Sequence, residues 1–180
     1  MSESEKVKAT KEIIQTRFLK LLDQKTIDKI TVRELCSEAN IHRGTFYRYY
    51  EDMYDLSAQI QADLLKKIEN IYVTSSDASI HDIAKRVIHL IYQEKLAFGS
   101  LFRYKRTTNF YHQVVDLGRK YMYNQPPFNQ FDDRETLYIY NCICAGVLGV
   151  IQTWINDDFR EPPEKIIHYI EQCMNTLIIN

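Results

Sequence analysis

Five side chains that donate hydrogen bonds lie close together in one short stretch of the sequence. They are Arg43, Thr45, Tyr47, Arg48 and Tyr49. Guanidinium and hydroxyl groups can donate to phosphate oxygens and to the edges of bases in a DNA groove. These residue types therefore favour contact with DNA, provided that one structural element holds them on its outward face.

The charge of the chain is unevenly distributed. Residues 6–50 carry ten Lys and Arg against five Asp and Glu, a net charge of +5, whereas the whole chain has a net charge of −1. A basic segment on an otherwise acidic chain is typical of a phosphate-binding surface. It is equally typical of the solvated face of ordinary helices, so that the charge alone leaves both interpretations open.

The donors need a short helix behind a turn, and the surrounding sequence predicts one. Thr31 followed by Glu34 predicts a capping box that opens a helix, and Asn40 suits the left-handed conformation that ends it. A second short helix is expected at 43–49, and a longer one at 8–23 precedes both. This is the helix-turn-helix arrangement, whose second helix lies in the major groove of DNA. Its small core would consist of Val32, Leu35, Ala39, Ile41, Phe46 and Tyr50.

Helical periodicity continues through the rest of the chain, with neither an alternating strand pattern nor an internal repeat. Asp52 is the expected N-cap of a long helix to about residue 72, and a turn-rich segment follows it. Further helices are expected at 80–93, 95–105, 110–123, 134–156 and 164–178. The predicted fold class is all-α, with a helix-turn-helix domain at 1–52, a connecting helix at 53–73 and a second helical domain at 74–180.

Residues 31–56 closely resemble the DNA-binding domain of the TetR/AcrR family of bacterial transcriptional regulators. The most specific part is Gly44-Thr45-Phe46-Tyr47, followed by two further aromatic residues and an acid-capped helix that reaches Leu56. The resemblance extends over about residues 8–60. It implies an Ω-shaped homodimer that binds DNA through its three N-terminal helices and holds a ligand pocket in the C-terminal domain.

The resemblance also implies which residues contact DNA. Tyr47 and Tyr49 would lie against phosphates, and Arg33 would flank the second helix near the DNA backbone. Arg43 and Arg48 would contact bases, because a guanidinium binds guanine through two hydrogen bonds. The complete set expected at the DNA is Thr31, Arg33, His42, Arg43, Gly44, Thr45, Tyr47, Arg48 and Tyr49.

Two positions depart from the family's pattern. His42 occupies a place where most members have Ser or another small residue. Met53 occupies a place where a Lys commonly meets a phosphate. Losing one phosphate contact should lower affinity and reduce the salt dependence of binding by about one charge, without abolishing binding.

Aromatic residues are concentrated in the middle of the second domain. One interpretation is that they only pack in the core and at the surface, because tyrosine packs well at the edge of a core with its hydroxyl in water. An apolar pocket with a few hydroxyl groups is the usual composition of a small-molecule site, and the resemblance favours that interpretation for some of them. The residues expected to bind a small-molecule effector are Tyr92, Phe102, Tyr111 and Tyr138.

The last two helices are expected to form a dimer. Residues 142–151 are apolar all round their helix, so that the helix must be buried on more than one side. The final helix carries an apolar stripe, and the family typically pairs these two helices with their symmetry mates. Both helices could instead complete the core of a monomer. The expected interface residues are Ala145, Leu148, Gly149, Ile170, Cys173 and Leu177.

Other classes of function have little support in the sequence. Cys142 and Cys144 point about 200° apart on a helix and cannot share a metal ion, so that core thiols are expected. We expect no metal, no cofactor and no catalytic residues, because the sequence shows no catalytic triad, paired carboxylates or phosphate-binding glycine loop. The ten-residue apolar run is too short to span a membrane, and there is no signal segment, which indicates a cytoplasmic protein.

The sequence therefore predicts a transcriptional regulator that is not an enzyme. We expect a ligand-responsive repressor that binds a palindromic operator in double-stranded DNA as a homodimer, with a small-molecule effector of unidentified structure and no membrane partner. An activator of the same family is an alternative. So is a helical protein-interaction module that has kept the fold without specific DNA binding, or a small-molecule enzyme or carrier that uses the aromatic region.

Overall fold

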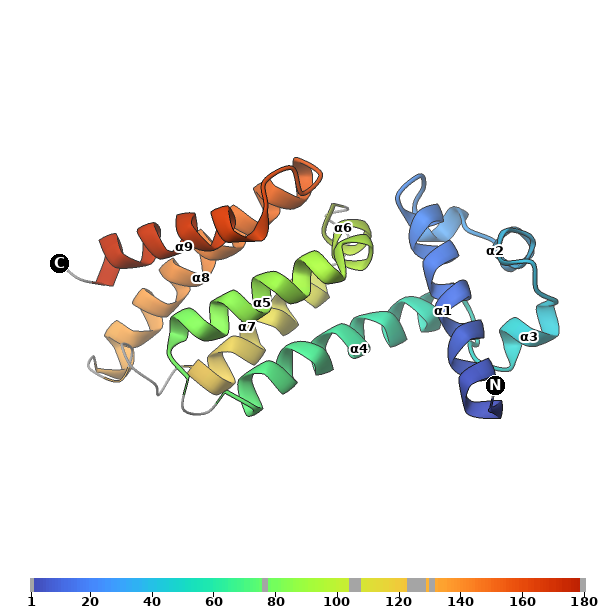
Figure 1. Ribbon diagram of the computed structural model, residues 1–180, viewed down its shortest axis with the longest axis horizontal. Coiled ribbons are helices and arrows are strands. Elements are labelled where there is room, and N and C mark those ends of the chain that lie inside the picture. The colour runs from blue at the N-terminus through green and yellow to red at the C-terminus, as the bar shows by residue number, and fades with distance from the viewer. Residues whose placement is uncertain (1, 76–77, 104–107, 123–128, 130–131, 179–180) are drawn as a thin grey trace. The chain divides into compact units, whose positions relative to one another are not determined.

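The protein consists of two compact units, and the boundary between them falls within one long helix. The computed structural model describes residues 2–75, 78–103, 108–122, 129 and 132–178. The first unit is Met1–Leu64 and the second is Leu65–Asn180. The described residues form α-helices and one short 3-10 helix without any strand, which confirms the predicted all-α class (Figure 1).

The first unit contains the predicted helix-turn-helix. Its elements in chain order are α1 (Glu3–Leu22), a 3-10 turn (Ile27–Lys29), α2 (Val32–Ala39), α3 (Arg43–Tyr47) and the first part of α4 (Met53–Val73). Helix α2 packs against α1 and α3. Helix α3 is two residues shorter than the helix predicted at 43–49, because Arg48 already forms its C-cap.

Local signals in the sequence fix the ends of these helices. The Thr31 hydroxyl accepts a hydrogen bond from the backbone N–H of Glu34 at 3.2 Å, and Asn40 ends α2 with φ 50° and ψ 50°. The Glu34 side chain does not complete the expected capping box. Its carboxylate pairs with the ammonium group of Lys25, and this pairing holds the pKa of Glu34 below its ordinary value.

The first unit closes around a small aromatic and aliphatic core. Phe46 from α3 is completely buried, and Tyr50 is 2% exposed. Of the six residues predicted for this core, Val32 and Ile41 are only half-buried. The core extends along α1, α2 and α4 through Ile14, Phe18, Leu35, Leu56 and Ile60. Because Phe46 is anchored in this core, the opposite face of α3 must point outward.

The second unit is a bundle of helices whose bounds follow the sequence closely. It contains the end of α4, α5 (Ile80–Gln93), α6 (Lys95–Arg103), α7 (Thr108–Met122), α8 (Asp133–Asn156) and α9 (Pro163–Ile178). Ser79 caps α5, and Asp132 forms a complete capping box with Glu135 at the start of α8. Helix α9 packs against α5 and α8, and α6 packs against α8 (Figure 1).

Helix α8 is the most apolar of the described helices in this bundle. Its length and the mean hydropathy of 1.4 of its most apolar window would also suit a membrane span, but it packs against α6 and α9 within the second unit. A tight turn joins it to α9, in which Asp158 and Phe159 have φ values of 57° and 56°. The rings of Trp154 and Phe159 are packed edge to face with their centroids 5.1 Å apart, and the indole N–H of Trp154 donates to the Glu161 carbonyl. These contacts hold the two helices antiparallel.

Candidate nucleic-acid interface and regulatory cavity

Helix α3 presents one buried side chain to the protein and several hydrogen-bond donors to solvent. Phe46 is its buried anchor, whereas Arg43, Arg48 and Tyr47 are exposed, the last with 59% of its surface accessible. Thr45 and Tyr49 are half-buried at the edge of the same surface. All five donors identified in the sequence therefore reach solvent around a single short helix, as contact with DNA would require.

A cation and two aromatic rings join α1 to the end of α3. The ammonium group of Lys11 lies 5.7 Å from the ring centroids of both Tyr49 and Tyr50. The hydroxyl of buried Tyr50 accepts a hydrogen bond from the Gln15 amide at 3.4 Å, and burial raises the pKa of Tyr50. Lys11 therefore places positive charge beside Tyr49, a contact that sequence spacing alone does not reveal.

The remaining residues of the predicted interface lie around α2 and the two helix starts. Thr31, Arg33 and His42 are exposed, and His42 is the N-cap of α3. Gly44 is exposed as well, and a Cβ atom added to it would meet no atom within 4 Å. The protein itself therefore does not need glycine at position 44.

Position 53 explains one departure from the family's pattern. Met53 is 5% exposed, so that its side chain packs in the core of the first unit instead of reaching solvent. Its neighbour Tyr54 is 59% exposed in the first turn of α4. Tyr54 offers a hydroxyl at this edge that the sequence analysis did not identify, because an isolated tyrosine at a helix start carries no distinctive spacing.

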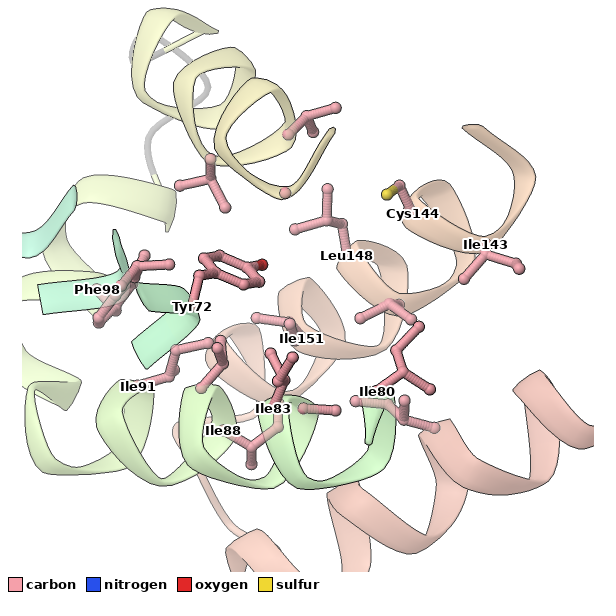
Figure 2. Close-up of a pocket in the computed structure, with 18 of the residues that line it drawn as sticks. Tyr72, Ile80, Ile83, Ile88, Ile91, Phe98, Ile143, Cys144, Leu148 and Ile151 are labelled. Carbon is pink, nitrogen blue, oxygen red and sulfur yellow. The ribbon is translucent and has the colours of Figure 1, made fainter. Parts of the chain in front are cut away.

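The second unit contains a cavity with an almost entirely apolar wall. Its volume is about 130 Å³, and residues from α4 to α9 line it. Figure 2 shows side chains of α5 and α8 converging on it, with Ile83 and Ile88 on one side and Leu148 and Ile151 on the other. Such a concave apolar space is the usual form of a small-molecule site.

The polar atoms of this wall are gathered where α4, α7 and α8 meet. The Tyr140 hydroxyl donates to the backbone carbonyl of Val115 at 2.9 Å. A Cβ atom on Gly118 would lie 2.7 Å from that hydroxyl oxygen and 3.5 Å from the hydroxyl oxygen of Tyr72. Burial raises the pKa of Tyr72 to about 12 and also raises the pKa values of Tyr140 and Cys144, so that all three groups are neutral at pH 7.

The residues predicted to bind a ligand are not brought together. Phe102 lines the cavity. Tyr92 stacks on Trp154 at 5.8 Å, and Tyr111 and Tyr138 are exposed outside the cavity wall. The sequence prediction considered aromatic residues in the middle of the second domain and therefore missed the contribution of α4, which supplies Ile68 and Tyr72. A usable signal existed in the four-residue spacing of Ile60, Leu64, Ile68 and Tyr72, which continues one apolar stripe from the first unit into the second.

The residues predicted for a dimer interface divide into two groups. Ala145, Gly149 and Cys173 are exposed, whereas Leu148 and Ile170 face the cavity of their own protomer. The side chain of Leu177 lies outside the described residues. Opposite its packed side, α8 exposes a face composed of Tyr138, Cys142, Ala145 and Gly149, which we call the outer face of α8.

Among the described residues, no group of His, Cys, Asp and Glu side chains could hold a metal ion. Cys142 is exposed and Cys144 lines the cavity, which agrees with their expected divergence on the helix. The expectation that Cys142 is a core thiol is wrong for the protomer, because it lies on the outward-facing side of its helix.

Comparison with known proteins identifies similar sequences over both units. Residues 19–60 match the family described as "Bacterial regulatory proteins, tetR family", and residues 78–176 match "Transcriptional regulator C-terminal region". The uncharacterized HTH-type transcriptional regulator YxbF of Bacillus subtilis (strain 168) is 22% identical over 171 residues, which are 85% of this chain and 41% of the relative. The chain thus spans about two fifths of the length of that relative.

Solved structures share the fold at low sequence identity. A transcriptional regulator from Aquifex aeolicus VF5 superposes with a TM-score of 0.71 at 17% identity, over 93% of this chain and 99% of the other. The dihydroxyacetone kinase operon activator DhaS superposes with a TM-score of 0.68 at 18% identity, over 94% and 96% of the two chains.

Proposed function

The chain belongs to the TetR family of bacterial transcriptional regulators, and from this premise we propose that it binds a palindromic operator as a homodimer through α3. As a member of a family of DNA-binding regulators it is not an enzyme. Its place of action would be the cytoplasm, where double-stranded DNA is accessible to it.

One observation carries the proposal of DNA binding. The donors of α3 are exposed on one side of a helix whose other side is fixed by fully buried Phe46. A recognition helix needs both properties, because loosely held donors would lose conformational entropy on binding. The guanidinium groups of Arg43 and Arg48 would contact bases, and the hydroxyls of Tyr47 and Tyr49 would contact phosphates.

The remaining interface residues have supporting roles in this proposal. Thr31, Arg33 and His42 are exposed where the backbone of DNA would pass, and Thr45 borders the recognition surface. Gly44 would allow the α3 backbone to come close to the DNA. Lys11 and Tyr54 add a positive charge and a hydroxyl to the same unit.

The cavity in the second unit supports a response to a small molecule. Its wall includes Ile68 and Tyr72 from α4, the helix that also supplies buried residues of the first unit. A ligand shifts the DNA-binding equilibrium only if it prefers one conformation, and a helix shared by both units can differ between conformations. We propose release from DNA as the response, and therefore a repressor. The activator named among the similar structures keeps activation as the alternative.

The test of DNA binding uses duplex DNA from upstream of the protein's own gene. Arg43→Ala should weaken specific binding by about 1–3 kcal/mol and relax the preference at one base position. Arg134→Ala, at an exposed position of the second unit, is the control and should keep wild-type operator affinity. An Arg43→Ala, Tyr47→Ala protein that selects the same operator with wild-type affinity would contradict the proposal.

Heparin chromatography separates DNA binding from the protein-interaction alternative. A DNA-binding protein should be retained and should elute earlier at higher salt, because binding releases counterions. Burial of Met53 predicts a salt dependence smaller by about one charge than that of a Met53→Lys variant whose ammonium group reaches solvent. A wild-type protein that is neither retained on heparin nor shifted by its upstream DNA would instead be an interaction module.

A further inference from the structure

One hydroxyl group enters the cavity without a partner in the protein. Figure 2 shows the ring of Tyr72 lying across the cavity with its oxygen directed inward. Within the described part of the chain this hydroxyl makes no hydrogen bond, although its ring stacks on Tyr121 at 5.4 Å. A hydroxyl that faces an apolar cavity without a protein partner can donate or accept a hydrogen bond, so that a ligand or water is expected to complete it.

The other polar side chains that line the cavity are already engaged. The Tyr140 hydroxyl donates to Val115, and Cys144 lies beside Tyr140, where a hydrogen bond between the two raises the pKa of the tyrosine further. The rest of the lining consists of aliphatic and phenylalanine side chains and Gly118. Tyr72 is therefore the group on this wall that is free to orient a ligand.

Charge is absent from the lining of the cavity, which contains no Lys, Arg, His, Asp or Glu side chain among the described residues. Arg119 of α7 lies near Tyr140 but is not part of the lining, and its Nε atom is buried without a partner. Its guanidinium carbon lies 5.8 Å from the Tyr140 ring centroid, and it donates to the Asn141 amide oxygen at 3.3 Å. An ionised ligand would have to leave water without finding an opposite charge, which is strongly unfavourable.

We propose that the cavity binds an uncharged, mainly apolar molecule of about the size of a substituted benzene ring, whose single polar group bonds the Tyr72 hydroxyl. This inference rests on the proposed regulatory function and names the chemical class of its effector. The volume of about 130 Å³ is close to that of apolar cavities of about 150 Å³ that take up benzene. Fatty-acid anions and phosphorylated metabolites do not belong to this class.

The first experiment compares three small probes on the wild-type protein by calorimetry at pH 7 without DNA. Phenol and toluene should bind, because both fill the cavity without carrying a charge. Phenol should also gain one hydrogen bond. Benzoate, which has a similar shape and a negative charge, should bind at least about 100-fold more weakly than phenol.

The second experiment removes the hydroxyl of Tyr72. Tyr72→Phe should weaken phenol binding by about tenfold, the value of one neutral hydrogen bond, and should leave toluene binding within about twofold of wild type. Tyr111→Phe is the matched control, because it makes the same chemical change at an exposed position of α7 outside the cavity. It should leave the binding of both probes unchanged. A thermal melt of each variant shows that the fold is intact.

Two results would overturn the inference. One is binding of benzoate as tight as that of phenol, and the other is an equal loss of phenol and toluene binding in Tyr72→Phe. Absence of phenol and toluene binding up to their solubility would also contradict it. Because these measurements need no DNA, a protein that fails them can still select its operator. In that case the regulatory function stands and the effector class is wrong.

Discussion

At the scale of single residues, Gly44 is a position where a substitution should affect operator binding without disturbing the fold. An added Cβ atom would meet open space in the protein, whereas on the proposed interface it would lie between α3 and the DNA. Gly44→Ala should therefore raise the free energy of unfolding by up to about 1 kcal/mol through helix propensity. The same variant should weaken operator binding by at least about tenfold, because the methyl group prevents close backbone approach.

Urea unfolding and a mobility-shift titration would measure the two effects of Gly44→Ala. Gly99→Ala is a suitable control, because its Cβ would make an ordinary 3.6 Å contact with Phe159 inside the second unit. That variant should keep wild-type operator affinity. A Gly44→Ala protein with unchanged operator affinity would place α3 away from the DNA.

Tyr72 predicts a second residue-level effect, on stability at high pH. Its pKa is raised by burial to about 12 in the folded protein, against about 10 in the unfolded chain. The neutral hydroxyl thus contributes stability that is complete below pH 10 and is lost as the pH rises toward 12. Between pH 9 and pH 11, Tyr72→Phe should lose about 1 kcal/mol less unfolding free energy than wild type.

Urea unfolding of both proteins at pH 7, 9 and 11 tests the role of Tyr72. The comparison with pH 7 removes any constant difference in stability between the two proteins. Parallel pH profiles for wild type and Tyr72→Phe would mean that the tyrosine ionises as readily in the folded protein as in the unfolded chain.

The exposed residues could be predicted from the sequence on the surface of α3, whereas the residues that line the cavity could not. Around α3, one buried aromatic at Phe46 determines which neighbours point outward, and the structure exposes them accordingly. In the second unit, tyrosines occur on several helices, and their types do not tell which helix faces which. Composition alone therefore favours Tyr92 and Tyr138, whereas Tyr72 faces the cavity because α4 continues past the first unit.

At the scale of helices, the contact of α7 with α8 depends on a missing side chain. A methyl group on Gly118 would lie 2.7 Å from the Tyr140 hydroxyl oxygen but 3.9 Å from the ring carbon that carries it. Gly118→Ala should therefore displace the hydroxyl from Val115 and lower the free energy of unfolding by about 1–3 kcal/mol.

A double variant isolates this steric cause. In the Tyr140→Phe background the hydroxyl is gone, so that Gly118→Ala should lower the free energy of unfolding much less than it does in the wild type. The double variant should therefore be more stable than the sum of the two single losses predicts, by about 1 kcal/mol or more. Thermal or urea unfolding of the four proteins provides the measurement. Additive losses would show that the new methyl group clashes elsewhere.

Helix positions followed from capping signals more reliably than the details of each cap did. Asn40 and Asp132 end and begin their helices as their residue types indicate, and the bounds of α5 agree with the predicted 80–93. The Thr31 cap is also present, but Glu34 turns to Lys25 instead of the N-cap backbone. A cap is local, whereas the competing ion pair comes from a residue nine positions away whose place depends on the fold.

At the scale of the whole molecule, the outer face of α8 is the surface that the proposed homodimer would cover. Only 28% of the most apolar window of this helix is buried, although the mean hydropathy of that window is 1.4. Small exposed residues on an apolar helix suit the close approach of a second helix. The sequence could not tell which side is exposed, because a helix that is apolar all round has no periodicity. Hence Leu148 and Ile170, expected at the interface, face the cavity instead.

The proposed homodimer can be tested at Gly149 without disturbing the protomer. A Cβ atom there meets no atom within 4 Å, so that an arginine side chain fits in the isolated chain but would place a charge within an interface formed by the outer face of α8. Sedimentation equilibrium of the wild type at micromolar concentration should give about 43 kDa, twice the 21.4 kDa of the chain. Gly149→Arg should give about 21 kDa with an unchanged circular dichroism spectrum, because a buried unpaired charge opposes association.

Gln113→Arg, which adds the same side chain at an exposed position of α7, should remain dimeric. A wild-type mass of one chain would rule out the dimer, and a dimeric Gly149→Arg would place its interface elsewhere. Since a palindromic operator presents two half-sites, the monomeric variant should also bind the full operator far more weakly, even though its α3 is untouched.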